Sequence, residues 1–238
     1  MAKFDELNEL YIDIRNCHEC PRMDREKSLR LIKAVNTESD VFIISQTLAA
    51  NQLRKSGVNF FQADGRLGNT GSSLEIFLNS FQRTVYPPRQ VTISSNVVIS
   101  KCKQRYTAVY NTEIAQCYPG KNNEGRGDRT PDSQELQKCI GKGFLIREIE
   151  IIKPKLILLM GKASRDTFFD YILKVRYPES LTEHIHRIVE NGKLPWYTLR
   201  DSDFHVLPVQ HASGANPRFR GMLFDTKLIK LIKEVLDG

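Results

Sequence analysis

Long hydrophobic runs are missing from this sequence. The longest apolar stretch, LILLM at residues 156–160, is far shorter than the roughly 20 apolar residues that a membrane-spanning helix needs. The opening residues, MAKFDELNEL, also lack the basic-then-apolar order of a secretory signal peptide. We therefore expect a cytoplasmic protein without a membrane partner, associated with the nucleoid if the organism is prokaryotic.

Internal repeats and long low-complexity linkers are missing too. The 238 residues, 40% hydrophobic and 26% charged, have the composition of an ordinary globular protein. They suffice for one large α/β domain and do not require a second. We expect a single domain over residues 1–238, with an N-terminal helical segment that carries the first two cysteines, and a monomeric protein.

Acidic residues are fewer than basic ones. The formal net charge is +7 and the isoelectric point is about 9.1. This balance favours a polyanionic partner, because each phosphate that Lys or Arg neutralises releases counterions. A basic surface without such a partner fits the charge equally well.

The sequence lacks the even set of cysteines that a disulfide framework needs. Two of its five cysteines form the motif Cys17-His-Glu-Cys20, and the others are Cys102, Cys117 and Cys139. The close pair could place two thiolates on one metal atom, and Cys117 and Cys139 could complete a set of four. This spacing fits a zinc ion and an iron-sulfur cluster alike.

Helical and β-type patterns alternate along the chain. Helices are expected over 3–15 and 25–34, and GNTGSSLEIFLNSF at 68–81 is a Gly-rich loop that opens a helix. At Thr130-Pro131-Asp132 a hydroxyl cap, a proline and an acid mark the start of a long helix that is expected to run through Ile152. Short β-rich runs lie at 40–45, 91–100, 108–115, 154–160 and 204–210. This alternation predicts a three-layer α/β/α fold around a mostly parallel sheet.

Open sheets of this kind bind ligands at the carboxyl ends of their strands. The loops after Ser45, Ala115 and Gln210 have unusual content: SQTLAANQLRKSGVNFFQADGRLGNTG, CYPGKNNEGRGDR and HASGANPRFRG. Polar groups, adjacent phenylalanines, glycines, a histidine and arginines would thus meet at one edge of the sheet. That convergence indicates a ligand site.

The motif pattern resembles a known family. The segment VYNTEIAQCYPGKNNEGRGDRTPDSQELQKCIGKGFLIREIEIIKPKLILLMGKAS is similar to the uracil-DNA glycosylase superfamily, most closely its iron-sulfur branch of the family 4 type. The resemblance runs from about Cys17 to about Arg220. It implies a central sheet of four strands, with an inserted β-hairpin at about 90–107 that carries Cys102 as a free structural thiol.

The resemblance also implies a cofactor. In that branch a C-x-x-C near the amino terminus joins two later cysteines around a 4Fe-4S cluster. The corresponding ligands here are Cys17, Cys20, Cys117 and Cys139. Zinc is the less favoured occupant of these four cysteines.

The first active-site motif is altered. Ser45-Gln46-Thr47-Leu48-Ala49 stands where the family has Gly-Glu-Ala-Pro-Gly or Gly-Gln-Asp-Pro-Tyr. Gln46 is compatible with a wall around a pyrimidine. Thr47 stands where some branches have a water-activating acid, but a hydroxyl of ordinary pKa is no general base at neutral pH.

A second segment, GVNFF at 57–61, resembles the family's Gly-x-Pro-Phe. The resemblance makes Phe60 the expected platform for a flipped base and Phe61 the second choice. Core packing is the alternative role of these phenylalanines.

The second motif is carried by QHASGANPRF, which resembles His-Pro-Ser. It implies that His211 donates to the base O2 and stabilises the negative charge of the departing base. The same resemblance and the charge of the loop assign a DNA-backbone role to Ser213, Asn216, Arg218 and Arg220. The loop GNTGSS, with Ser72, would offer backbone amides to a further phosphate.

Glu113 stands where the family has the asparagine that reads uracil. An ionised carboxylate only accepts hydrogen bonds, so it would suit N3–H but repel O4. A protonated Glu113 could mimic the amide, and an ionised one would favour a base with an exocyclic amine. Asn111, two residues back on the same face, could reach the base instead. A salt bridge to Lys or Arg is the purely structural alternative.

These motifs imply a DNA repair enzyme of base excision. It would flip a damaged, deaminated base, uracil or a relative, out of single- or double-stranded DNA and hydrolyse its N-glycosidic bond. The first alternative is an iron-sulfur nucleic-acid-binding protein of the same fold, with another lesion specificity or no glycosylase activity. The second is a zinc-stapled interaction domain.

Overall fold

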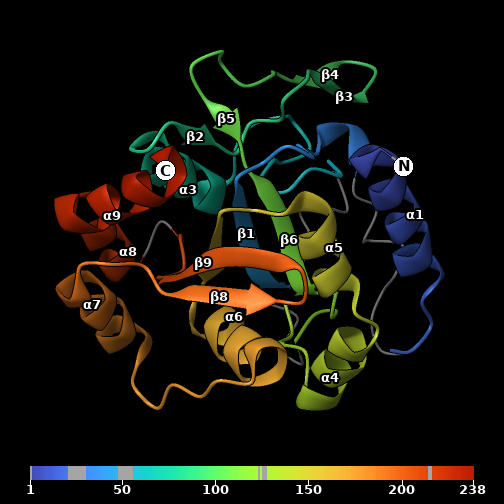
Figure 1. The fold of residues 1–238 in the computed structure, drawn as a ribbon. Helices are drawn as coiled ribbons and strands as arrows, with labels where there is room; N and C mark the ends of the chain where they lie inside the picture. The colour runs from blue at the N-terminus through green and yellow to red at the C-terminus, as the bar shows by residue number, and fades with distance from the viewer. Residues whose placement is uncertain (1, 21–30, 48–55, 123, 125–127, 214–215) are drawn as a thin grey trace.

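A five-stranded sheet forms the centre of the computed structural model, which describes residues 2–20, 31–47, 56–122, 124, 128–213 and 216–238. The strands follow the order β6-β1-β7-β9-β8; Figure 1 shows β1 beside β6 and β8 beside β9. Their bounds are β6 Tyr110–Ala115, β1 Val41–Thr47, β7 Leu156–Met160, β9 Ser202–Val209 and β8 Trp196–Leu199. The first four are parallel to one another, and β8 pairs with β9 in the antiparallel sense.

The expected mostly parallel sheet is confirmed, but its strand number is five rather than four. The additional strand, β8, has only four residues and lies at the edge of the sheet. Trp196 at its start is 58% exposed, so the segment lacks the buried apolar run by which the other strands are recognised. Edge strands are often this short.

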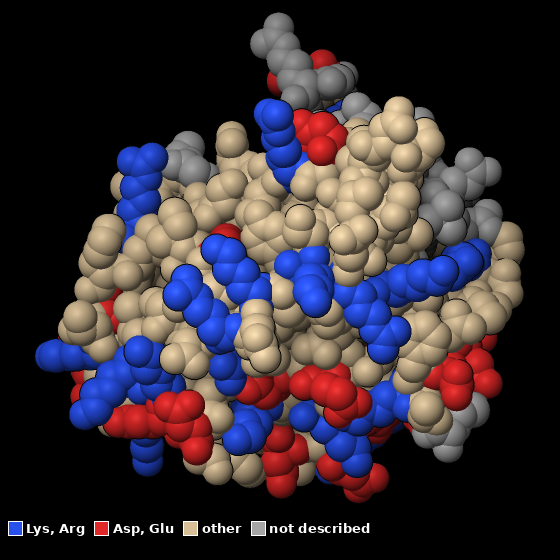
Figure 2. Space-filling view, turned by 90° about the horizontal axis from the view of Figure 1, so that it is seen from above, with Lys and Arg blue, Asp and Glu red and all other residues tan. Residues whose placement is uncertain are grey.

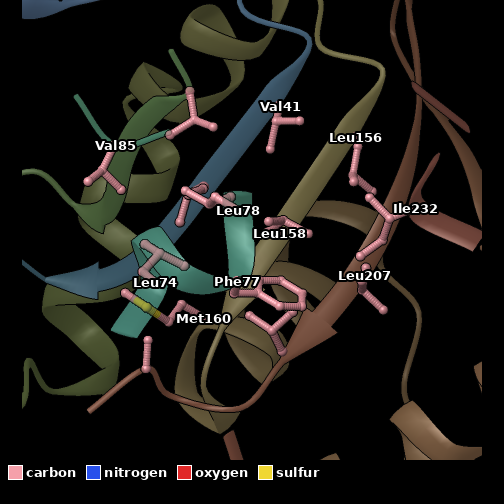
Figure 3. Close-up of a cluster of buried hydrophobic side chains, with 14 of the residues drawn as sticks. Val41, Leu74, Phe77, Leu78, Val85, Leu156, Leu158, Met160, Leu207 and Ile232 are labelled. Atoms are coloured by element: carbon pink, nitrogen blue, oxygen red, sulfur yellow. The ribbon is translucent and has the colours of Figure 1, made fainter. Parts of the chain in front are cut away.

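Helices cover both faces of the sheet, because successive side chains of each strand point to opposite sides. On β1, Val41 and Ile43 belong to one apolar cluster and Phe42 and Ile44 to the other. Figure 3 shows the first cluster, where Phe77 packs toward Leu158 and Leu207. This cluster is covered by α3 (Asn69–Asn79), α7 (Leu181–Asn191), α8 (Pro217–Leu223) and α9 (Thr226–Asp237).

The second cluster lies under the amino-terminal helix and the middle of the chain. It contains apolar residues of α1 (Lys3–Asn16), α4 (Ser133–Gly141), α5 (Phe144–Ile152) and the π-helical turn Phe168–Leu173 that follows α6 (Lys162–Thr167). The two clusters together make the predicted three-layer α/β/α arrangement. None of the helices in the described part of the chain combines the length and apolarity that crossing a bilayer requires.

The single long helix expected up to Ile152 is wrong, since α4 and α5 are separate. Gly143 ends the connection with φ 70°, a left-handed conformation that glycine adopts without strain. The expected hydroxyl cap is also wrong. Asp132 caps α4 by accepting from the Glu135 N–H at 2.9 Å, while the Glu135 carboxylate accepts from the Asp132 N–H at 2.9 Å. Cys139 therefore lies in the last turn of α4.

The inserted hairpin is confirmed. Its strands are β3 Val91–Ser94 and β4 Val97–Ile99, and the short pair β2 Arg83–Thr84 and β5 Thr107–Ala108 closes its base. Of the helix expected over 25–34, residues 25–30 lie outside the described ranges, and Ile32–Ala34 forms a 3₁₀ turn.

Candidate active site and cysteine cluster

A cavity of about 320 Å³ lies at the carboxyl ends of β1, β6 and β7. The parallel register explains why distant segments meet there, since Ser45 on β1 lies beside Glu113 on β6. Its lining comes from six separate parts of the chain: Ser45, Gln46, Thr47, Asn59, Phe60, Thr70, Glu113, Met160, Gly161, Lys162, Ala163 and His211. Five predicted site residues are thereby brought together: Gln46, Thr47, Phe60, Glu113 and His211. Leu48 and Ala49 of the first motif lie outside the described residues.

His211 follows β9 and is held by its own loop. The Ser213 backbone N–H donates to His211 Nδ1 at 3.2 Å, so a neutral ring carries its hydrogen on Nε2. The Asn216 side chain donates to the His211 carbonyl oxygen at 3.0 Å. Gly161 lies beneath the ring, where an added Cβ would contact His211 Cβ at 3.5 Å and Cδ2 at 3.6 Å. The loop thus leaves Nε2–H as the donor that is free to act on a ligand.

The protonation state of His211 suits that role. The residue is exposed at the cavity edge, yet the surrounding protein removes part of its hydration and lowers the pKa of the imidazole below its ordinary value. The neutral ring is therefore favoured at neutral pH. A neutral histidine donates one hydrogen bond without carrying a charge of its own.

Phe60 lies in a strained but well-supported position. Its φ of 69° is unusual for a residue with a Cβ, and the Gly68 N–H donates to its carbonyl oxygen at 2.8 Å. An added Cβ on Gly71 would lie 2.7 Å from Phe60 Cβ, so only glycine fits at that point of α3. Phe61, the second choice for the aromatic platform, is fully buried and packs edge-on against Tyr86, with ring centroids 5.3 Å apart. It does not line the cavity.

Glu113 is buried, with 3% of its surface exposed, although it lines the cavity. Asn59 Nδ2 donates to Glu113 Oε1 at 3.0 Å. Asn111 does not line this cavity. It lies in a smaller one of about 40 Å³, also bounded by Asn59, and its Oδ1 is buried without a hydrogen-bond partner among the described residues.

The residues expected at the DNA backbone have different surroundings. Ser72 is exposed on α3, and Arg218 and Arg220 are exposed on α8. Asn216 caps α8 by accepting from the Arg218 N–H at 3.1 Å. Ser213 and Asn216 thus help to hold the His211 loop, and both arginine side chains lie on the surface beside that loop.

The four cysteines of the expected ligand set border one small cavity. Cys17, Cys20, Cys117 and Cys139 surround it together with Ile14, Glu19, Gln116 and Phe144. The Gln116 backbone N–H lies 3.4 Å from Cys139 Sγ and donates to it. Burial, then the neighbouring thiols, raises the pKa of Cys139 to about 12, so its thiolate needs a nearby cation. Cys102 lies apart in the insertion, where its N–H donates to the Pro87 carbonyl oxygen.

This donor set suits a thiophilic metal or cluster in composition and burial. In the described ranges, however, no three His, Cys, Asp or Glu side chains are arranged to hold a metal ion. The four sulfurs are therefore gathered around one point without being at ligand geometry.

A family model described as the Uracil DNA glycosylase superfamily matches residues 32–235. The chain belongs to this superfamily. A curated relative named Type-4 uracil-DNA glycosylase, from Sulfurisphaera tokodaii (strain DSM 16993 / JCM 10545 / NBRC 100140 / 7), is 27% identical over 118 residues. That alignment covers 48% of this chain and 46% of the relative, so the chain spans about half the length of the protein it matches.

The superfamily match includes every residue that lines the cavity and also Cys117 and Cys139. It begins after Cys17 and Cys20. Asn59 and Gly161 escaped the sequence prediction. Asn59 lies in the GVNFF motif, whose signal is its pair of phenylalanines. The proximity of Gly161 to His211 depends on the pairing of β7 with β9.

Proposed function

We propose that the protein is a DNA glycosylase that takes a damaged, deaminated base, uracil or a relative, into the cavity and hydrolyses its N-glycosidic bond. The observation that carries this proposal is the gathering of Gln46, Thr47, Phe60, Glu113 and His211 around one cavity. Membership of the superfamily supports the reaction class. The substrate is single- or double-stranded DNA, and the enzyme works as a monomer in the cytoplasm.

His211 assists departure of the base. Cleavage of the glycosidic bond builds positive charge on the sugar and negative charge on the base. A donor at the base O2 stabilises that negative charge. The Ser213 N–H on Nδ1 leaves Nε2–H for this purpose, and the lowered pKa keeps the ring neutral. The loop contacts of His211 pre-orient the donor before the base arrives.

Phe60 and the β1 end complete the reaction centre. The Phe60 ring offers an apolar wall on which a flipped base can stack. Thr47 and Gln46 lie on the β1 side, where their polar groups can hold the attacking water. Because the sugar already carries most of the positive charge in the transition state, water attack needs little help from a strong base. Thr47 therefore orients water rather than deprotonating it.

We further propose a 4Fe-4S cluster on Cys17, Cys20, Cys117 and Cys139. The cavity that these cysteines share, its mostly apolar lining and the N–H donor to Cys139 support the proposal. The bound cluster would supply structural cross-links. It would join the end of α1 to α4 and to the loop after β6, and so hold the strand that carries Glu113.

The cluster is tested by purifying the protein without oxygen and measuring iron, acid-labile sulfide and zinc. We expect visible absorption that bleaches on reduction, and its loss in Cys139→Ser. The matched control Cys102→Ser keeps the absorption. A colourless protein with tightly bound zinc would replace the cluster by a zinc site.

The activity is tested with single- and double-stranded oligonucleotides that carry uracil, hypoxanthine, xanthine or a 5-substituted pyrimidine. Formation of abasic sites is the readout. We expect release from at least one substrate and a loss on the order of 10²-fold or more in His211→Ala. If no substrate releases its base while DNA binding persists, the protein is a nucleic-acid-binding member of the fold and the glycosylase proposal is wrong.

A further inference from the structure

The cavity contains a side-chain pair that the reaction described above does not use. Asn59 and Glu113 come from a loop and from β6, and they meet at 3.0 Å between Asn59 Nδ2 and Glu113 Oε1. Both line the cavity beside Phe60. Because both line the same cavity as Phe60, they are within reach of a base that stacks on its ring.

Glu113 fixes the orientation of the Asn59 carboxamide. An ionised carboxylate only accepts hydrogen bonds, so the amide must present Nδ2, and not Oδ1, toward it. Rotating the amide by 180° would set two acceptors against each other. One N–H of Nδ2 is thereby used, while the second N–H and Oδ1 make no further hydrogen bond within the described residues.

An amide held in one orientation offers a donor and an acceptor in a fixed order. This pair matches the edge of a base that has a carbonyl next to a ring N–H, as uracil, hypoxanthine and xanthine do. Cytosine and adenine carry an amine next to a bare ring nitrogen, which needs the reverse order. A buried partner such as Glu113 makes that reversal costly, because it would leave the carboxylate facing an oxygen.

We propose that Asn59 reads the base edge and that Glu113 is a positioning residue, which fixes the amide so that deaminated bases are preferred over their amino parents. The inference rests on the proposed glycosylase function and deepens it. Glu113 acts here through Asn59 and does not itself contact the base.

The test separates base recognition from cleavage. Single-stranded oligonucleotides carry one 2′-fluoro-2′-deoxyuridine or one 2′-fluoro-2′-deoxycytidine, since the fluorine slows base loss, and their dissociation constants are compared. We expect the wild type to prefer uracil at least about tenfold, a typical discrimination for one good base-edge pair. Asn59→Leu should bring the ratio close to one, and Asn59→Asp, whose carboxylate only accepts hydrogen bonds, should bring it to one or below. Glu113→Gln should lower it severalfold, because a glutamine lets the Asn59 amide turn.

The matched control is Asn69→Leu, which changes an exposed asparagine on α3 outside the cavity lining and should keep the wild-type ratio. Unfolding curves check that each variant is folded, and Asn59→Asp keeps the side-chain volume if Asn59→Leu does not fold. A wild-type ratio near one, or an unchanged ratio in both Asn59 variants, overturns the inference. Failure of the glycosylase proposal has a different signature, namely absence of abasic sites with every lesion.

Discussion

At the scale of single residues, the His211 ring is set by backbone rather than by other side chains. Ser213 supplies the N–H to Nδ1, and Gly161 supplies a flat surface below the ring. Gly161 has φ 88° and ψ 166°, a conformation that residues with a Cβ rarely adopt. The position of the donor thus depends on a residue without any side chain.

Gly161→Ala should therefore harm both stability and activity. The strained backbone is expected to cost about 1–3 kcal/mol of unfolding free energy. The added Cβ itself would meet His211 only at ordinary contact distance, so the expected fall in the rate of base release comes from the backbone relaxing and shifting the surface beneath the ring. Chemical denaturation and single-turnover kinetics measure the two effects. The control is Gly141→Ala at the end of α4, where an added Cβ meets nothing within 4 Å. Equal behaviour of the two variants would contradict the supporting role of Gly161.

At the scale of elements, β6 is held from both of its faces. Glu113 points to the cavity, while Tyr110, Thr112 and Gln116 bind the carboxylate of Glu148 on α5. The distances are 2.7 Å from Tyr110 Oη, 2.6 Å from Thr112 Oγ1 and 3.1 Å from Gln116 Nε2. Glu148 is fully buried. This network couples the strand to the helix beneath it.

Glu148→Ala should be strongly destabilising, by about 3 kcal/mol, because it leaves buried donors without their acceptor. The midpoint of urea unfolding measures the loss. Glu150→Ala is the control on the same helix, since Glu150 forms a surface ion pair with Arg200, an interaction worth at most about 1 kcal/mol. If Glu148→Ala lowers the unfolding free energy by less than Glu150→Ala does, the network around Glu148 does not stabilise the fold.

The pH dependence of stability should report on α7. His184 is 1% exposed and lies 4.2 Å, between ring centroids, from Tyr177. Burial lowers its pKa from 6.5 to about 4. Since unfolding restores the ordinary pKa, the folded state loses stability as the pH falls below 6.5, and the loss is complete below about 4. Its size is about 3 kcal/mol.

His184→Phe should remove this part of the pH dependence, measured by unfolding at pH 7 and pH 4.5. His186→Gln, on the exposed side of the same helix, should keep it. If His184→Phe and the wild type lose equal stability on acidification, His184 is not the group responsible.

At the scale of the whole molecule, positive charge gathers on one face. Figure 2 looks down on the end of the molecule that carries β3 and β4, and shows a band of Lys and Arg side chains across it. The sequence between Glu75 and Glu113 contains no acidic residue. Within it Arg89, Lys101, Lys103 and Arg105 are exposed. This band lies at the amino ends of the parallel strands, whereas the cavity lies at their carboxyl ends.

Salt titration distinguishes the two ends of the molecule as DNA contacts. If DNA lies over the cavity, Arg218→Ala should lower the slope of log affinity against log salt by about 1, as expected for one lost phosphate contact. Arg89→Ala, which changes an exposed arginine between β2 and β3, is then the matched control and should leave the slope unchanged. The opposite pattern would place the DNA along the band and away from the His211 loop.

Much of this architecture could be predicted from the sequence, and the predictions that were wrong have physical reasons. Continuous apolar runs such as LILLM predict buried parallel strands, and these are present. The edge strand at Trp196 was missed because half of it faces solvent, and the break at Gly143 was missed because the apolar pattern continues across it. The grouping of His211 with Gln46 and Phe60 could be expected only from the motifs. The contact of Asn59 with Glu113 depends on the conformation of a loop, which the pattern of apolar residues along the sequence does not predict.

The backbone around Phe60 has a consequence for how a nucleotide would enter. The segment 60–68 closes on itself through Gly68 N–H to the Phe60 carbonyl and Gln62 N–H to the Arg66 carbonyl, both at 2.8 Å, and Gly71 lets α3 press against it. An aromatic wall built this way is ready before any ligand arrives. The free-energy cost of capture then falls on the nucleic acid, which must unstack to reach it. Unstacking costs least where the base is poorly paired. We therefore expect the protein to bind lesions in frayed, mismatched or single-stranded DNA in preference to lesions in intact duplex.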